Sequence, residues 1–320
     1  MGLAHRRLLL LLLHLLLLVA AAAEAAAAGA GRKEKGIGGG GGLRFRGGSG
    51  TFKVVQVADM HYADGRRTGC LDVLPSEAAG CSDINTTAFL YRLFRDEDPD
   101  LVVFTGDNIY GFDATDAAKS MDAAIAPAIN MNLPWAAVIG NHDQEVVTIL
   151  RCLPSVDMTK YMKEEPKQKA AAPGLVYFHI PLPEFSSFTS SNFTGVKQEG
   201  ISSPSINSGF FASMVEAGDV KAAFIGHDHV NDFCGKLNGI QLCYAGGFGY
   251  HAYGKAGWSR RARVVSVQLE KTDGGEWRGV KSIKTWKRLD DPHLTTIDSE
   301  VLWNRGSNGR RKKNPDGKMR

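Results

Sequence analysis

Apolar residues along the chain follow two spacings, one typical of strands and one typical of helices. Short runs rich in β-branched residues predict strands, whereas apolar residues three or four positions apart predict helices. The predicted strands span residues 52–58, 101–105, 136–139, 175–180, 220–225, 240–245, 263–269 and 280–286. The predicted helices span residues 88–98, 113–132 and 207–217. Because strands and helices alternate first and strands then follow one another, we expect an α/β fold that ends in a mostly antiparallel run.

The two ends of the chain lack these patterns. Arg6 and Arg7 precede a leucine-rich run and then small residues, which is typical of a secretory signal peptide. A retained membrane anchor is the alternative, and we disfavour it because a span needs about 20 apolar residues before polar flanks. The expected divisions are a signal peptide (1–28), a glycine-rich flexible leader (29–50), one domain (51–304) and a basic disordered tail (305–320).

The charge of the chain is unevenly distributed. Its 320 residues carry a net charge of +4, of which residues 1–46 contribute +5 and residues 305–320 contribute +6, so the part between them carries −7. An acidic body lacks the basic footprint of a nucleic-acid-binding protein. The basic run at 310–313 is the one candidate for such a patch, and we interpret it as a solvated terminus. From the acidic body we therefore expect no nucleic-acid partner. From the predicted signal peptide we expect a secreted, extracellular or vacuolar location and no stable membrane anchor.

Cysteines and glycosylation sequons agree with secretion. Cys70 and Cys81 are close in sequence, as are Cys234 and Cys243, and Cys152 is left over. In an oxidising compartment the two local pairs are disulfide candidates, although four cysteines allow three pairings. Zinc ligation is the alternative, which the absence of a C-x-x-C spacing disfavours. Asn85 and Asn192 each begin an N-x-T glycosylation sequon.

Polar side chains with metal-binding chemistry follow five of the predicted strands. The segments are Asp59-Met60-His61, Gly106-Asp107-Asn108-Ile109-Tyr110, Gly140-Asn141-His142-Asp143, His179 at the end of the fourth strand, and Gly226-His227-Asp228-His229. Carboxyl ends of strands in an open α/β sheet lie along one rim, where ligands bind. Glycines before three of the segments allow sharp turns and a close approach of the backbone.

Taken singly, each segment has an ordinary structural explanation. A lone Asp at a strand end is usually a turn residue, and a lone His is usually a structural one. Five such segments in order favour a metal centre, because imidazoles and carboxylates are ligands for zinc, manganese and iron. Asp107, central in the series, is the candidate to bridge two ions. Such a pair clamps a phosphate and lowers the pKa of a bound water toward about 7, so that hydroxide attacks phosphorus.

These ordered blocks resemble the calcineurin-like metallophosphoesterase superfamily, with its D-x-H, G-D, G-N-H-[DE], H and G-H-x-H motifs. The segments Gly106–Tyr110 (G-D-x-x-Y) and Val176–His179 (V-x-x-H) narrow the resemblance to small plant purple acid phosphatases, some of which are described as inactive. The resemblance covers roughly residues 52–303. It implies an αββα sandwich of two sheets and a phosphatase that acts on phosphate monoesters.

The resemblance also implies roles for individual residues. One metal would be held by Asp59, Asp107 and His229, with His61 or Tyr110 as a further ligand. The second would be held by Asp107, Asn141, His179 and His227. His142 would donate a proton to the phosphate or leaving group, oriented by Asp143. The implied ions are Fe with Zn or Mn, and the implied partner is a small phosphorylated substrate.

The sequence departs from the family in two places. His61 stands where purple members usually have glycine, which leaves both His61 and Tyr110 as candidate iron ligands. Only 36 positions separate Asp143 from His179, where the family has a longer stretch with strands of the second sheet. We interpret this region as shortened, as in a splice form or gene model, and expect the ligands to survive in an incomplete and poorly stable sheet.

Three functions remain open from sequence. The first is an acid phosphatase acting on monoesters. The second is a phosphodiesterase or nucleotidase of the same superfamily, since the motifs define the metal core and substrate choice lies in flanking loops. The third is a metal-binding relative that has lost catalysis. The sequence does not determine metal identity, natural substrate, pH optimum or oligomeric state.

Overall fold

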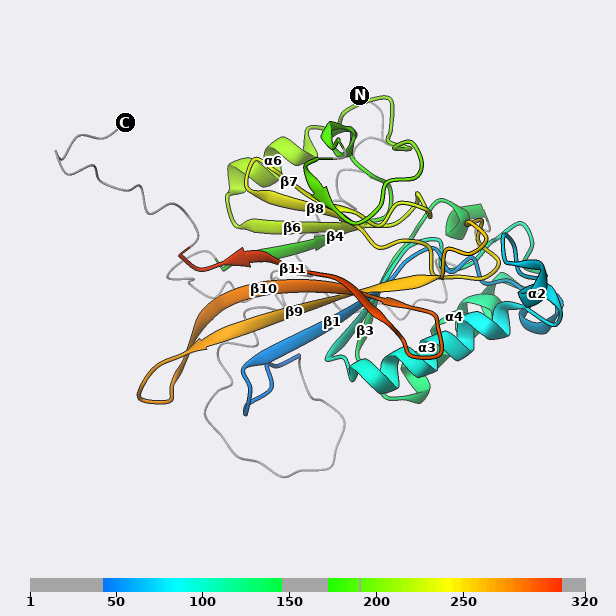
Figure 1. The fold of residues 1–320 in the computed structure, drawn as a ribbon, viewed down its shortest axis with the longest axis horizontal. Helices are drawn as coiled ribbons and strands as arrows, with labels where there is room; N and C mark the ends of the chain where they lie inside the picture. The colour runs from blue at the N-terminus through cyan, green and yellow to red at the C-terminus, as the bar shows by residue number, and fades with distance from the viewer. Residues whose placement is uncertain (1–42, 146–171, 190, 307–320) are drawn as a thin grey trace.

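The computed structural model describes residues 43–145, 172–189 and 191–306, and these residues form a four-layered sandwich. Two sheets pack face to face, with helices α3 and α4 outside the first sheet and α6 outside the second (Figure 1). This is the expected αββα arrangement. Strands β1, β2, β6 and β8 carry consecutive buried residues, as expected of strands that are covered on both faces.

The first sheet has six strands in the order β11-β10-β9-β1-β2-β3. Strands β1, β2 and β3 are parallel, whereas β9, β10 and β11 run antiparallel to their neighbours. Their bounds are β1 (Thr51–Val57), β2 (Leu101–Thr105), β3 (Trp135–Val138), β9 (Arg261–Lys271), β10 (Trp277–Leu289) and β11 (Thr296–Asn304). The antiparallel run expected at the end of the chain is thus half of this sheet.

The second sheet has five strands in the order β4-β6-β8-β7-β5. Strands β4, β6 and β8 are parallel, and β7 and β5 complete the sheet in antiparallel pairing. Their bounds are β4 (Gly174–Tyr177), β5 (Phe193–Thr194), β6 (Val220–Ile225), β7 (Cys234–Leu237) and β8 (Ile240–Tyr244). Sequence patterns missed β5, β7 and the edge strand β11.

Three apolar clusters hold the layers together. In β1, Val55 and Val57 face α3 and α4, while Val54 faces the second sheet. In β6, Phe224 packs between the sheets, while Ile225 packs in the outer cluster that includes α6. This period of two is the geometry of strands that are buried on both faces.

The helices begin at capping residues that the apolar spacing alone does not identify. Helix α3 (Asp83–Glu97) starts earlier than predicted, because Ser82 caps it and exchanges hydrogen bonds with Asn85. Helix α4 (Ala117–Asn130) starts later, at the Asp116 cap. The remaining helices of the described residues are α2 (Pro75–Ala78), α6 (Phe210–Ala217) and the 3-10 helices η1 (Gly65–Arg67), η2 (His142–Glu145) and η4 (Pro183–Ser187).

The domain begins before residue 51, where the flexible leader was expected to end. Phe45 packs against Phe52 with ring centroids 5.7 Å apart. Arg46 donates from Nε to Asp100 Oδ1 at 2.9 Å. The predicted signal peptide, Cys152, most of the shortened region between Asp143 and His179 and most of the basic tail lie outside the described residues.

Both predicted disulfides are present, Cys70–Cys81 and Cys234–Cys243. The second joins directly paired residues of β7 and β8. Asn85 and Asn192 are both exposed, and their glycosylation stays a prediction. Among the described residues, no helix has the length and apolar character that a membrane span requires.

Candidate metal centre

The polar segments predicted from sequence converge where the two sheets meet. Each follows the carboxyl end of a parallel strand: Asp59 follows β1, Asp107 β2, Asn141 β3, His179 β4 and His227 β6. Three strands therefore belong to the first sheet and two to the second. The expectation of a single rim is confirmed, with the refinement that two sheets contribute to it.

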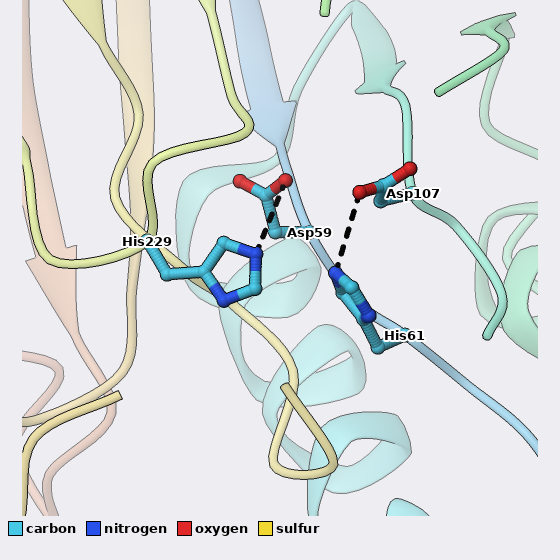
Figure 2. A group of neighbouring side chains, drawn as sticks. All are labelled: Asp59, His61, Asp107 and His229. Carbon is cyan, nitrogen blue, oxygen red and sulfur yellow. Dashed lines mark ion pairs between the residues drawn. The ribbon is translucent and has the colours of Figure 1, made fainter. Parts of the chain in front are cut away.

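A first cluster comprises Asp59, His61, Asp107 and His229. All four are buried, and one ligand atom from each lies within 4.8 Å of the others. Figure 2 shows the rings of His229 and His61 turned toward the two carboxylates; His229 Nε2 lies 3.7 Å from Asp59 Oδ1 and His61 Nε2 lies 3.5 Å from Asp107 Oδ2. This donor set suits a transition metal or zinc.

A second cluster shares Asp107 and adds His179 and His227. His179 Nε2 lies 3.1 Å from Asp107 Oδ2 and 3.2 Å from Asn141 Oδ1, so the Asn141 amide joins this group. Asp107 is the one residue common to both clusters among the described residues. Asp107 can therefore contribute to both groups, and its role as a bridge between two ions stays a prediction.

Backbone carbonyls orient two of the imidazoles. His179 Nδ1 donates to the carbonyl oxygen of Thr105 at 2.9 Å, and His229 Nδ1 donates to that of Tyr253 at 2.9 Å. Each bond consumes the Nδ1 proton and leaves Nε2 facing the carboxylates. A second hydrogen bond of this kind is how proteins fix the tautomer of a metal-binding histidine.

The charges in the site favour ligands in their metal-binding forms, with two exceptions. Burial lowers the pKa of His61, His227 and His229, which keeps their imidazoles neutral. Burial opposes ionisation of Asp107, but the hydrogen bond from His179 and the nearby His61 imidazole hold its pKa well below the usual range.

The exceptions are Asp59 and His179. Burial, reinforced by the charge of Asp107, raises the pKa of Asp59 to about 8. Burial lowers the pKa of His179, yet its hydrogen bond to Asp107 and its proximity to Asp59 outweigh this and raise it to about 9. Both groups hold protons that a cation would displace.

The backbone is bent sharply around the clusters. Asp59, His61, Asp107 and His227 all have positive φ, between 47° and 78°, which is uncommon for residues with a side chain. A Cβ on Gly140 would overlap the Asp107 carboxylate and amide. Strain concentrated at these residues is typical of a functional site, and it explains why glycine precedes Asn141.

The residues present fit a metal pair. Asp59 Oδ2 and His61 Nε2 are buried without a hydrogen-bond partner, although buried polar atoms are nearly always paired. Both atoms belong to residues of the first cluster, so a cation bound by them would satisfy these atoms. His61 therefore fits as a ligand. The Tyr110 ring stacks against His61, with centroids 5.5 Å apart, so it lies beside the first cluster.

His142 and Asp143 differ from expectation in how they interact. Asp143 accepts hydrogen bonds from the amides of Gly140 and Ile109, both at 2.9 Å, and from Asn108 Nδ2 at 3.0 Å. The carboxylate that contacts the His142 ring is Glu145, with Nδ1 2.6 Å from Oε1. In the structure Glu145, and not Asp143, contacts the His142 imidazole, while Asp143 braces the loop.

Sequence reasoning missed Tyr253, which contacts the ligand His229 in three ways. The two rings stack with centroids 3.8 Å apart, the Tyr253 carbonyl accepts from Nδ1, and the hydroxyl accepts from the His229 amide at 3.1 Å. The hydroxyl donates to Glu199 Oε2 at 2.9 Å. Tyr253 lies in an irregular loop, so no periodicity could identify it.

Known proteins resemble this chain in sequence and fold. It is 48% identical to "Probable inactive purple acid phosphatase 29" of Arabidopsis thaliana over 341 positions, covering 81% of this chain and 88% of that one. It is 43% identical to "Probable inactive purple acid phosphatase 14" of the same plant over 349 positions, covering 83% and 87%. In both alignments about 80 positions have no counterpart among the 320 residues of this chain, which agrees with a shortened internal region.

A solved structure supports the fold. Purple acid phosphatase PPD1 from yellow lupin (Lupinus luteus) seeds superposes with a TM-score of 0.50 at 14% identity, covering 81% of this chain and 55% of that one. Residues 52–231 match the sequence profile of the family described as Calcineurin-like phosphoesterase. The chain therefore belongs to the calcineurin-like phosphoesterase family, with close homology to plant proteins named as probable inactive purple acid phosphatases.

Proposed function

We propose that this chain binds two metal ions around Asp107 and hydrolyses phosphate monoesters. The single observation that carries the proposal is the shared position of Asp107 in two buried clusters of metal-binding side chains. Asp59, His61 and His229 would hold one ion, and Asn141, His179 and His227 the other. We expect Fe with Zn or Mn, because carboxylate and imidazole ligands serve all three.

When bound, the two ions would polarise the phosphate and activate water. The chain's own residues supply the rest. The shared carboxylate keeps both ligand groups together, and the backbone amide of His142 donates to Asp107 Oδ1 at 2.9 Å, which holds this carboxylate in place. His142, oriented through Glu145, lines the cavity and is the candidate to give a proton to the leaving oxygen.

A second candidate function is metal and phosphate binding without turnover. The names of the two Arabidopsis relatives favour it, as do the alignment positions that this chain lacks. These comparisons support this candidate more than the first. A phosphodiesterase or nucleotidase is a third reading, because the same metal core serves both ester types.

The test compares p-nitrophenyl phosphate with bis(p-nitrophenyl) phosphate, using protein loaded with Fe, Zn or Mn and protein treated with a chelator. Metal-dependent hydrolysis of the monoester, abolished in Asp107→Asn, is the expected result. Preference for the diester would move the assignment to a phosphodiesterase. If folded, metal-loaded protein cleaves neither ester, the second candidate replaces the first.

The disulfides and exposed sequons support secretion or a vacuolar location, because disulfides persist in oxidising compartments. We propose that the first 28 residues are removed as a signal peptide and that Asn85 and Asn192 carry glycans. Mass spectrometry of the secreted protein, with and without glycosidase treatment, tests both points.

A further inference from the structure

Four cluster residues line a cavity of about 430 Å³, and its lining also includes one leucine and two tyrosines; the four are His61, Asp107, His227 and His229. This volume falls within the range of about 300–1,000 Å³ that is typical of small-molecule sites. Leu71, Tyr110 and Tyr253 line the cavity beside the ligand residues. Phe112 extends the same wall outward: it is 75% exposed, and its ring meets Tyr110 edge-on at 6.4 Å.

Apart from histidines, the ionisable side chains that line the cavity are carboxylates and tyrosines. Asp107, Asp113 and Asp228 line the cavity, and the described lining residues include neither lysine nor arginine. The neighbouring Arg260 is buried and donates to the carbonyl oxygens of Leu71, Ala252 and Tyr253. A leaving group with a further negative charge would meet carboxylates and no free guanidinium.

The Leu71 wall is held firmly. Leu71 follows Cys70 of the Cys70–Cys81 disulfide, and its amide donates to the Tyr250 carbonyl at 2.8 Å. The next residue, Asp72, accepts from the Gly254 amide at 2.9 Å. The disulfide loop is thereby hydrogen-bonded to the segment that carries Tyr253.

From these features we infer that the site takes phosphate monoesters of uncharged, aromatic leaving groups, seated between Leu71 and Tyr253, in preference to phosphates that carry further negative charge. The inference rests on the proposed function for its phosphate anchor. It concerns binding, however, and can be tested without turnover. An aromatic ring would bury apolar surface against Leu71 and stack beside the two tyrosines.

The test uses non-hydrolysable phosphonates and metal-loaded full-length protein, with affinity measured by calorimetry. Phenylphosphonate should bind about tenfold more tightly than methylphosphonate, which has the same anionic group without the ring. 4-Carboxyphenylphosphonate, with a charge added at the far side of the ring, should bind more weakly than phenylphosphonate.

The variant Leu71→Asn should reduce the phenyl-to-methyl ratio at least threefold and leave methylphosphonate affinity unchanged. Leu74→Asn is the matched control, because Leu74 is a leucine of the same disulfide loop that is similarly exposed, 39% against 45% for Leu71, and does not line the cavity. It should leave the ratio as in the parent protein.

Equal affinities for the phenyl and methyl compounds, or a ratio unaffected by Leu71→Asn, would overturn the inference. Tighter binding of the carboxylated ring would contradict its charge argument. The phosphonate ranking with no ester hydrolysis would leave this inference standing and refute the proposed catalysis. Ester hydrolysis without the expected order of phosphonate affinities would support the proposed catalysis and refute this inference.

Discussion

The Nδ1 of His179 donates to the carbonyl oxygen of Thr105 at 2.9 Å, and this bond joins the two sheets at the metal centre. Thr105 ends β2 of the first sheet, whereas His179 follows β4 of the second. The bond sets the ring so that Nε2 faces Asp107 at 3.1 Å. The packing of the two sheets against each other therefore also brings together the ligand residues that each sheet carries.

The Tyr253 hydroxyl should matter for metal affinity. Tyr253→Phe keeps the ring stack and the backbone carbonyl, but it removes the hydroxyl contacts with the His229 amide and Glu199. Loss of such support for a ligand typically weakens metal binding by 10–100-fold, and we expect about tenfold, measured by competition with a chelator. Tyr91→Phe is the control, since the Tyr91 hydroxyl pairs with Asn130 in α4. Equal affinities in the two variants would refute this role.

Substitution of Glu145 should mainly affect catalysis, whereas substitution of Asp143 should mainly affect stability. Glu145→Gln removes the charge beside His142 and should lower kcat about tenfold with little effect on thermal stability. The Asp143 carboxylate accepts three hydrogen bonds with its two oxygens. Asp143→Asn replaces one oxygen with an NH₂ group, which cannot accept, so the free energy of unfolding should fall by about 1–3 kcal/mol. Steady-state kinetics and urea unfolding measure the two effects. The reverse pattern would restore the orienting role first predicted for Asp143.

Asp83 should make stability depend on pH. Burial raises its pKa to about 6, although it accepts hydrogen bonds from the amides of Ala63 and Gly65. Because the folded pKa lies above the ordinary value of 3.8, its contribution is fully present below about pH 4 and is lost as pH rises through 6. The loss is on the order of 3 kcal/mol.

Asp83→Asn carries no titrating group at this position. Its stability relative to the parent protein should rise between pH 4 and pH 7, measured by urea unfolding of metal-free samples. A difference between the two proteins that is constant over this interval would show that Asp83 titrates normally.

Most of the site could be predicted from sequence because its chemistry follows strand ends. Asp59, Asp107 and Asn141 each come two or three positions after a strand that apolar runs reveal, so their convergence follows from parallel pairing. The choice between His61 and Tyr110 could not be made, because it depends on ring positions that only the folded loop defines.

Other elements have weak sequence signals for physical reasons. Strand β11 lies at a sheet edge, and Leu302 is its one fully buried residue among the described ones, so the strand lacks an apolar alternation. Helix α3 was predicted too short because the residues that begin it, from the Ser82 cap to Thr87, are polar except for Ile84. The contact of Glu145 with His142 was not predicted, because Asp143 lies next to His142 in the motif and was the obvious candidate. Only the structure shows that backbone amides occupy the Asp143 carboxylate.

The central claim is that Asp107 serves two metal ions at once, and the number of metal ions bound per chain tests it most directly. Elemental analysis of folded protein should give two metals per chain in the parent, about one in His227→Asn, and fewer than one in Asp107→Asn. Circular dichroism confirms that each variant is folded. Two metals retained in Asp107→Asn, or none in the folded parent protein, would contradict the account.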